Sequence, residues 1–194
     1  MAHAALRIIH EEHAALAAML RSILLLLSRH RRDATFPDFA VLRAMLFYMD
    51  EFPEQRHHVK ESALLFPKLR ARSDEANQVL ERLDQDHARG ERAIRDLEHA
   101  LLAFEMMGET RREAFELAAR QYADFYFEHM LLEEKQVLPL AERVLDAQDW
   151  AELDAAFTAN RDPLTGHEPE DEYRALFSRI VNALPAPLGL GEAH

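Results

Sequence analysis

The sequence predicts an all-α protein: an up-down antiparallel four-helix bundle with additional short helices at its C-terminal end. Apolar residues recur in alternating steps of three and four over long stretches, which is typical of amphipathic helices packed side by side. Only 5 glycines and 8 prolines interrupt 194 residues that are 48% hydrophobic. That is too few turn residues for a β-sandwich or barrel, and the length suits one domain with a large core.

The first helix is expected over residues 2–30, and a run of charged residues around Arg29 ends it, with cations at the negative end of the helix dipole. Its apolar stripe places a histidine at a core position. The stripe is Leu6, Ile9, His13, Leu16, Leu20, Ile23 and Leu27.

The second helix is expected over residues 37–66, with Pro37 in its first turn. Pro53 lies inside it and should kink or loosen one turn, because proline has no N–H to donate. The helical spacing of this segment puts His57 and Glu61 on the buried face.

The third helix is expected over residues 74–107, with His87 at a core position of the same repeat and Gly108 at its end. Gly90 costs about 1 kcal/mol of helix propensity. We expect it to leave space for a close neighbour beside His87.

The fourth helix is expected to open with a capping box formed by Thr110 and Glu113, and Pro139 should bend its last turns. Its predicted stripe contains six core positions and a terminal polar one. The stripe is Phe115, Ala118, Tyr122, Phe125, His129, Leu132 and Gln136, with Glu133 alongside.

The pattern weakens after Asp146. Asp149 and Glu152 are candidate caps of a short helix that carries Trp150, and a second capped segment is expected over residues 169–184. We therefore expect a bundle over residues 1–148, a helical cover of the same domain over 149–184 and a tail over 185–194.

Charge and composition exclude several classes of function. There are 23 basic and 35 acidic residues, a net charge of −12, so nucleic acid and anionic membranes would repel the chain. The longest apolar run is far shorter than the roughly 20 residues of a membrane span, and no signal peptide is evident, so a cytoplasmic protein is expected. With no cysteine, any metal must be held by imidazole and carboxylate.

Six residues combine into a predicted metal site. Each helix places one histidine on its apolar stripe, and two of the four carry a glutamate one turn later, on the same face. Buried carboxylates need a strong cationic partner. The predicted ligands are His13, His57, Glu61, His87, His129 and Glu133. Imidazole with carboxylate suits iron, and also zinc, copper, nickel or manganese.

Coordination arithmetic favours two metals with open positions. Two octahedral irons offer twelve positions; four imidazole nitrogens and two bridging carboxylates fill eight, and a shared oxo or hydroxo bridge fills two more. One position per iron remains for water or a small diatomic ligand, which indicates reactivity rather than a structural metal.

Other residues leave alternatives open. His58 is rotated by about 100° from His57, so we expect it at the surface or behind the ligands rather than among them. Tyr122 and Tyr126 near His129 are interpreted as aromatic packing, with a hydrogen bond behind the metal as the alternative. Glu134 and Lys135 are interpreted as solvent-facing charges. A ferritin-like di-iron scheme through Glu54 and Asp84 fits less well, because the first helix offers histidine where that scheme needs glutamate.

Two segments resemble the signature of hemerythrin-like proteins, also called the HHE cation-binding domain. They are Glu54-Gln55-Arg56-His57-His58-Val59-Lys60-Glu61, running into Leu65-Phe66-Pro67, and His129-Met130-Leu131-Leu132-Glu133-Glu134, with Glu12-His13 and Asp86-His87 matching the remaining histidines. The resemblance covers roughly residues 10–145. It implies a bundle around a non-haem di-iron centre, with the four histidines as terminal ligands and the two glutamates as bridges.

One departure from the family affects the expected function. Oxygen-carrying hemerythrins have a second histidine four residues after the one in the third helix, and here that position is Glu91. Either both metals are open or Glu91 substitutes as a ligand, which weakens the case for simple oxygen carriage. We expect a di-iron protein that binds, senses or reacts with oxygen, nitric oxide or peroxide. The alternatives are a metal- or redox-responsive interaction module and a di-iron oxidoreductase of the iron–sulfur repair type. The sequence contains no phosphate-binding glycine loop and no nucleophile motif that would indicate another class of enzyme.

Overall fold

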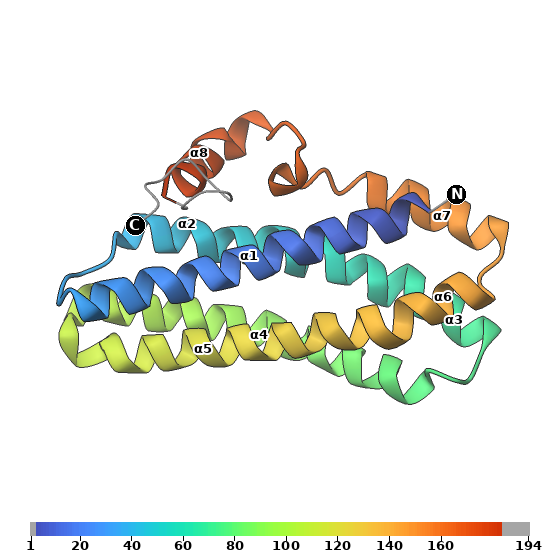
Figure 1. Cartoon of the computed structure of the whole chain (residues 1–194), viewed down its shortest axis with the longest axis horizontal. Helices are drawn as coiled ribbons and strands as arrows, with labels where there is room; N and C mark the ends of the chain where they lie inside the picture. Colours follow the sequence, from blue (N-terminus) through green and yellow to red (C-terminus); the bar gives the residue numbers. More distant parts are fainter. Residues whose placement is uncertain (1–2, 184–194) are drawn as a thin grey trace.

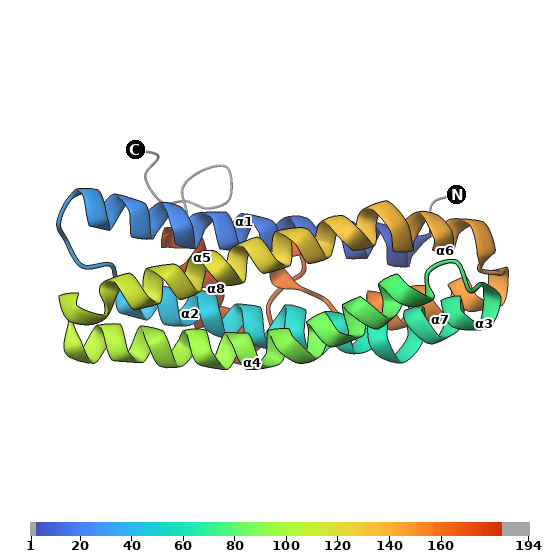
Figure 2. The same ribbon diagram turned by 90° about the horizontal axis from the view of Figure 1, so that it is seen from below.

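The computed structural model describes residues 3–183, and within them the chain is helical without a strand. Four long antiparallel arms form the bundle (Figures 1 and 2). Two of them are single helices, and the other two are assembled from consecutive helical pieces. The arms are α1 (Ala4–Arg32); α2 (Phe39–Met49), η1 (Asp50–His58), η2 (Glu61–Leu65) and α3 (Phe66–Arg72); α4 (Asn77–Met107); and α5 (Glu109–Leu132), η3 (Glu133–Val137) and α6 (Leu138–Val144). The predicted fold class is confirmed.

The C-terminal segment lies along the α1 and α2 side of the bundle (Figure 1). α7 (Ala147–Thr158) packs on α1, and α8 (Arg174–Ala183) packs on α2, with the short 3₁₀ turns η4 (Pro163–Thr165) and η5 (Asp171–Tyr173) between them. The predicted tail, residues 185–194, lies outside the described residues. No helix within residues 3–183 is both long and apolar enough to cross a membrane.

Two predicted helix caps are wrong in detail. Gly108, with φ of 66°, is the only residue between α4 and α5, so α5 already begins at Glu109 and the Thr110 hydroxyl donates backwards to the Met107 carbonyl. The predicted Thr110–Glu113 capping box therefore does not form. α7 is capped by Asp146, because the chain is extended at Leu145 just before it; Asp149 is the reciprocal partner in that capping box.

Three π-helical turns interrupt the second and fourth arms. One of them, η1, contains Pro53, as expected of a residue that cannot donate to the preceding turn. A π turn holds more residues than an α turn and so shifts the phase of the side chains that follow. Within η3, Val137 is buried and Gln136 is exposed, so the prediction that Gln136 continues the inner stripe is wrong.

The bundle core consists of two apolar clusters with a polar layer between them. One cluster contains Leu20, Leu46, Leu97 and Phe115, and α8 adds Ile180 to it. The other contains Ile9, Leu69, Leu80 and Leu138, and α7 adds Leu153. Every arm therefore passes from one apolar cluster through the polar layer to the other, and that layer contains the predicted metal ligands.

Candidate metal centre

All six predicted ligands lie in the polar layer, and none of them is more than 7% exposed. α1 contributes His13, the second arm His57 and Glu61, α4 His87, and the fourth arm His129 and Glu133. The helical periodicity that placed each of them on an inner face therefore agrees with the structure. The structure also shows which of them face one another.

A first group of donors contains His13, His57, Glu61 and Glu133, whose ligand-type atoms all lie within 4.8 Å of one another. The His13 Nε2 atom is 3.2 Å from Glu133 Oε2. The His57 Nε2 atom is 2.9 Å from Glu61 Oε1. Two imidazoles and two carboxylates thus converge on one point.

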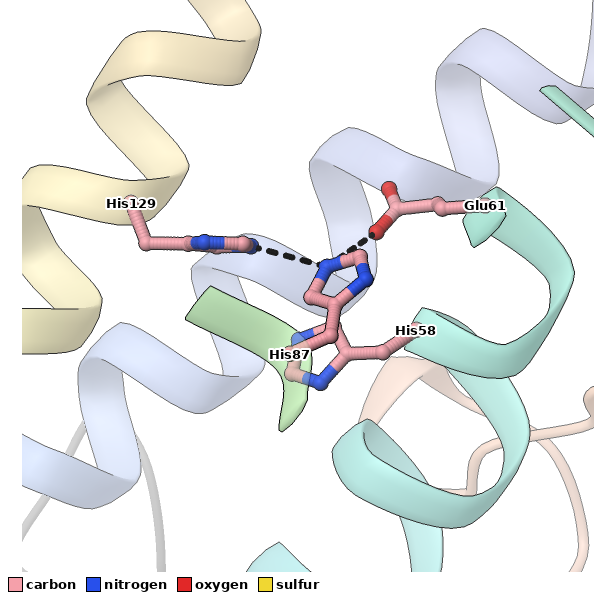
Figure 3. A group of neighbouring side chains, drawn as sticks. All are labelled: His58, Glu61, His87 and His129. Atoms are coloured by element: carbon pink, nitrogen blue, oxygen red, sulfur yellow. Dashed lines mark hydrogen bonds and ion pairs between the residues drawn. The ribbon is translucent and has the colours of Figure 1, made fainter. Parts of the chain in front are cut away.

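A second group contains His58, Glu61, His87 and His129, again within 4.8 Å of one another (Figure 3). The His87 Nε2 atom lies 3.4 Å from Glu61 Oε2 and 3.2 Å from His129 Nε2. Glu61 belongs to both groups and presents a different oxygen to each histidine that it contacts. Glu133 also reaches the second group, with Oε2 3.5 Å from His129 Nε2.

His58 was expected either at the surface or behind the ligands, and the surface position is wrong. His58 is 4% exposed, and its ring stacks on that of His87 with centroids 4.4 Å apart. The second arm has bundle neighbours on both sides, so the rotation from His57 to His58 leads from the α1 side to the α4 and α5 side, not to solvent. Glu91, the other candidate extra ligand, has a half-exposed side chain near Arg95 and belongs to neither group.

Four of the five histidines in the two donor groups have a hydrogen-bond partner on the ring nitrogen that faces away from the centre. In each, Nδ1 bonds to an oxygen outside the donor groups, which leaves Nε2 for the interior. The pairs are His13 with Glu134 (3.0 Å), His57 with Glu12 (2.6 Å), His58 with Glu54 (3.1 Å) and His87 with Ser62 (2.8 Å). This pattern is typical of metal-binding histidines. The interpretation of Glu134 as a purely solvent-facing charge is therefore wrong, whereas Lys135 is exposed.

Two tyrosines hold the carboxylate behind His58. The hydroxyls of Tyr122 and Tyr126 both donate to Glu54 Oε1, the former at 3.0 Å, so the hydrogen-bonding alternative applies to both. Gly90 makes this arrangement possible, because a Cβ there would collide with the Tyr126 hydroxyl and lie 2.9 Å from Glu54 Oε1. The predicted space at Gly90 is confirmed.

The ferritin-like alternative is not supported by these contacts. Glu54 is occupied by His58 and the tyrosines, and Asp84 accepts from Ser62 and from Arg70 at 2.9 and 2.8 Å. Neither carboxylate belongs to a donor group.

Several polar atoms that face the interior of the centre have no hydrogen-bond partner among the described residues. Within residues 3–183, His13 Nε2, His57 Nε2 and both oxygens of Glu61 and Glu133 are buried without a hydrogen-bond partner. Burial opposes a charge on His13, yet the carboxylates of Glu133 and Glu134 raise its pKa to about 9. Burial and the neighbouring His87 and His129 lower the pKa of His58, which keeps it in the neutral form that binds metal. The chemistry of this donor set therefore fits metal binding.

Two cavities adjoin the donors. A small cavity of about 10 Å³, room for about one water, is lined by Leu16, Phe52 and Pro53 beside His13 and His57. A wider pocket of about 330 Å³ is lined by Glu54, His58, Ser62, His87 and Glu91, on the side of the second group.

A family model described as the hemerythrin HHE cation binding domain matches residues 4–141. No curated protein and no solved structure gives a significant match to the chain. The matched range contains both donor groups and ends before α7.

Proposed function

Because the chain belongs to the hemerythrin HHE cation-binding family, we propose that it holds two iron ions and takes a small diatomic or peroxide ligand at the open positions. One observation carries this proposal: two donor groups share the carboxylate of Glu61, and its two oxygens are buried without a hydrogen bond among the described residues. A buried carboxylate in that position is costly unless cations bind on both sides.

His13, His57 and Glu133 would hold one iron, and His58, His87 and His129 the other, with Glu61 between them. His58 is thus proposed as the fifth histidine ligand. It would replace the histidine that oxygen-carrying hemerythrins have at the position of Glu91. Iron held by imidazole and carboxylate supplies reversible redox chemistry and open positions for small ligands. Zinc or manganese would fit the same donors and are alternatives for the isolated protein.

The chain's own residues orient the donors and limit the ligand. Glu12, Glu54, Glu134 and Ser62 fix the ring orientations through Nδ1. The apolar side chains of Leu16, Phe52 and Pro53 leave about 10 Å³ beside the first group, which on that side admits a molecule of about the size of water and excludes organic substrates. This size limit at the first group favours oxygen, nitric oxide or peroxide as its ligand, in a protein that we expect in the cytoplasm.

Metal stoichiometry of matched variants tests the proposal. Protein reconstituted with Fe²⁺ under anaerobic conditions should contain two irons per chain and change its visible spectrum on exposure to oxygen or nitric oxide. Glu61→Ala should lose both ions, and His58→Ala one. His99→Ala, an exposed histidine on α4, is the control and should keep both. Wild-type protein that binds fewer than two irons, or a His58→Ala variant that retains both tightly, would contradict the assignment.

The regulatory alternative has one observation in its favour: residues of the C-terminal segment contact groups that hold the metal ligands. The oxidoreductase alternative has no comparable observation.

A further inference from the structure

We propose that Asn160, which lies after α7, positions the metal ligand His57 and thereby couples metal binding to docking of the C-terminal cover. The C-terminal cover is defined here as residues 147–183. The inference rests on the proposed function, since it concerns a ligand of the first donor group. It extends that function to a segment outside the range matched by the family model.

A short chain of contacts joins Asn160 to His57. The Asn160 side-chain amide donates to Glu12 Oε2 at 2.9 Å, and the same oxygen lies 2.6 Å from His57 Nδ1. Lys60, from the arm that also contains His57, donates to the side-chain oxygen Oδ1 of Asn160. Asn160 is 2% exposed and Glu12 8%, so water has little access to replace these bonds.

The turn after α7 is anchored against the site on both sides of Asn160. Phe157 is fully buried, with its ring edge-on to that of His57 at 5.8 Å between centroids. Asp162 is 3% exposed and accepts from the Tyr48 hydroxyl at 2.7 Å. Between them Arg161 has φ of 49°, a strained value for a residue other than glycine. Such strain persists where neighbouring contacts determine the backbone, so the turn is built to present Asn160 inward.

The role of Asn160 follows from what Glu12 does. Glu12 accepts from Nδ1 of His57 and so leaves its Nε2 atom free for the metal. Without the Asn160 amide, Glu12 loses one of its two partners and is free to turn away from the ring. Loss of a group behind a ligand typically weakens metal affinity by about 10- to 100-fold. Because Asn160 acts one contact further away, we expect a loss near the lower end of that range.

Coupling between two sites is reciprocal. If Asn160 helps His57 to bind metal, metal at the first group must also stabilise the docked C-terminal cover. Metal occupancy would then change the stability of a segment that lies along α1 and α2 (Figure 1).

The experiment compares wild-type protein, Asn160→Leu and Thr158→Ala. Thr158 is the control, because it is exposed, two residues earlier, and donates only to the Asp154 carbonyl among its recorded bonds. The dissociation constant for Co²⁺, a spectroscopic substitute for iron, is measured by competition with a chelator. Amide hydrogen exchange over residues 147–166 is measured with and without Co²⁺.

We expect Asn160→Leu to weaken Co²⁺ binding about tenfold and to abolish the slowing of amide exchange that Co²⁺ causes in the wild type and in Thr158→Ala. Affinity within twofold of wild type together with unchanged metal-dependent exchange would overturn this inference and leave the di-iron proposal intact. A wild type that binds no Co²⁺ would overturn both. If Asn160→Leu does not fold, Asn160→Asp takes its place, because it removes the amide donor to Glu12 but retains the side-chain size and the acceptor for Lys60. The same two measurements and the same criteria then apply to Asn160→Asp.

Discussion

Substitution of Gly90 by alanine sets helix propensity against packing, and the structure predicts which of the two prevails. Gly90 lies in the interior of α4, where alanine would favour the helix by about 1 kcal/mol. The added Cβ, however, would collide with the Tyr126 hydroxyl and stand 2.9 Å from Glu54 Oε1. Tyr126 has little room to move, because its ring is fully buried and stacks on His58 at 5.4 Å.

The expected cost follows from two losses. Overpacking a well-filled core costs about 1–3 kcal/mol. Displacing the Tyr126 hydroxyl from Glu54 removes a buried hydrogen bond, worth about 1–2 kcal/mol. Against the gain in propensity, Gly90→Ala should lower the free energy of unfolding by about 1–4 kcal/mol, measured by denaturant titration of the metal-free protein.

Two further variants identify the cause. Glu91→Ala, at the exposed neighbouring position, should change stability by less than about 0.5 kcal/mol. In a Tyr126→Phe background the atom at collision distance is gone, and the nearest atoms to the added Cβ become Glu54 Oε1 at 2.9 Å and a ring carbon at 3.0 Å, so Gly90→Ala should cost clearly less there. If Gly90→Ala is as stable as the wild type, or costs the same in both backgrounds, the packing argument is refuted.

Burial raises the pKa of Asp162 to about 6 from an ordinary 3.8. At a pH above both values, where Asp162 is ionised in the folded and in the unfolded protein, its charge lowers the free energy of unfolding by about 3 kcal/mol. The stabilising effect of Asp162→Asn, measured by urea unfolding, should therefore grow by about that amount as the pH rises from 4 to 7; a constant difference would contradict the assignment. Arg112 is buried, donates to the Thr35 carbonyl at 2.8 Å and lies 3.9 Å from the buried carboxylate of Glu116. Arg112→Met should therefore cost about 3–5 kcal/mol, while exposed Arg111→Met changes little. Equal effects of the two arginine variants would show that this buried network is unimportant. Removing metal with a chelator should lower Tm, since metal at 100 times its Kd stabilises the fold by about 2.7 kcal/mol; an unchanged Tm would argue against binding to the folded state.

Much of the fold was predictable because it depends on local patterns. Stripes of apolar residues define four arms and their inner faces, and Pro53 and Gly90 marked an interruption and a close approach. These features follow from periodicity and from the chemistry of single residues. The end positions of helices were less predictable: the tight turn at Gly108 removed the expected Thr110 cap.

The groups that surround the ligands were not predictable from the same patterns. Asn160 and Glu12 are 148 positions apart in the sequence, and no periodicity links a turn residue after α7 to a carboxylate on α1. The surface alternative for His58 was wrong because a rotation of about 100° around one helix leads to solvent only where no other helix lies on that side, and here α4 and α5 lie there. The E-E-H run at Glu11–His13 contained a usable signal, since a carboxylate beside a core histidine is available to contact the next arm.

The central claim is that two metal ions bind on either side of Glu61, with His58 as a ligand of one of them. The most direct measurement is anomalous scattering at the iron absorption edge from crystals of the iron-loaded protein. The account predicts two peaks that both contact Glu61, one among His13, His57 and Glu133 and the other among His58, His87 and His129. A single peak, or a second peak that His58 does not contact, would contradict it.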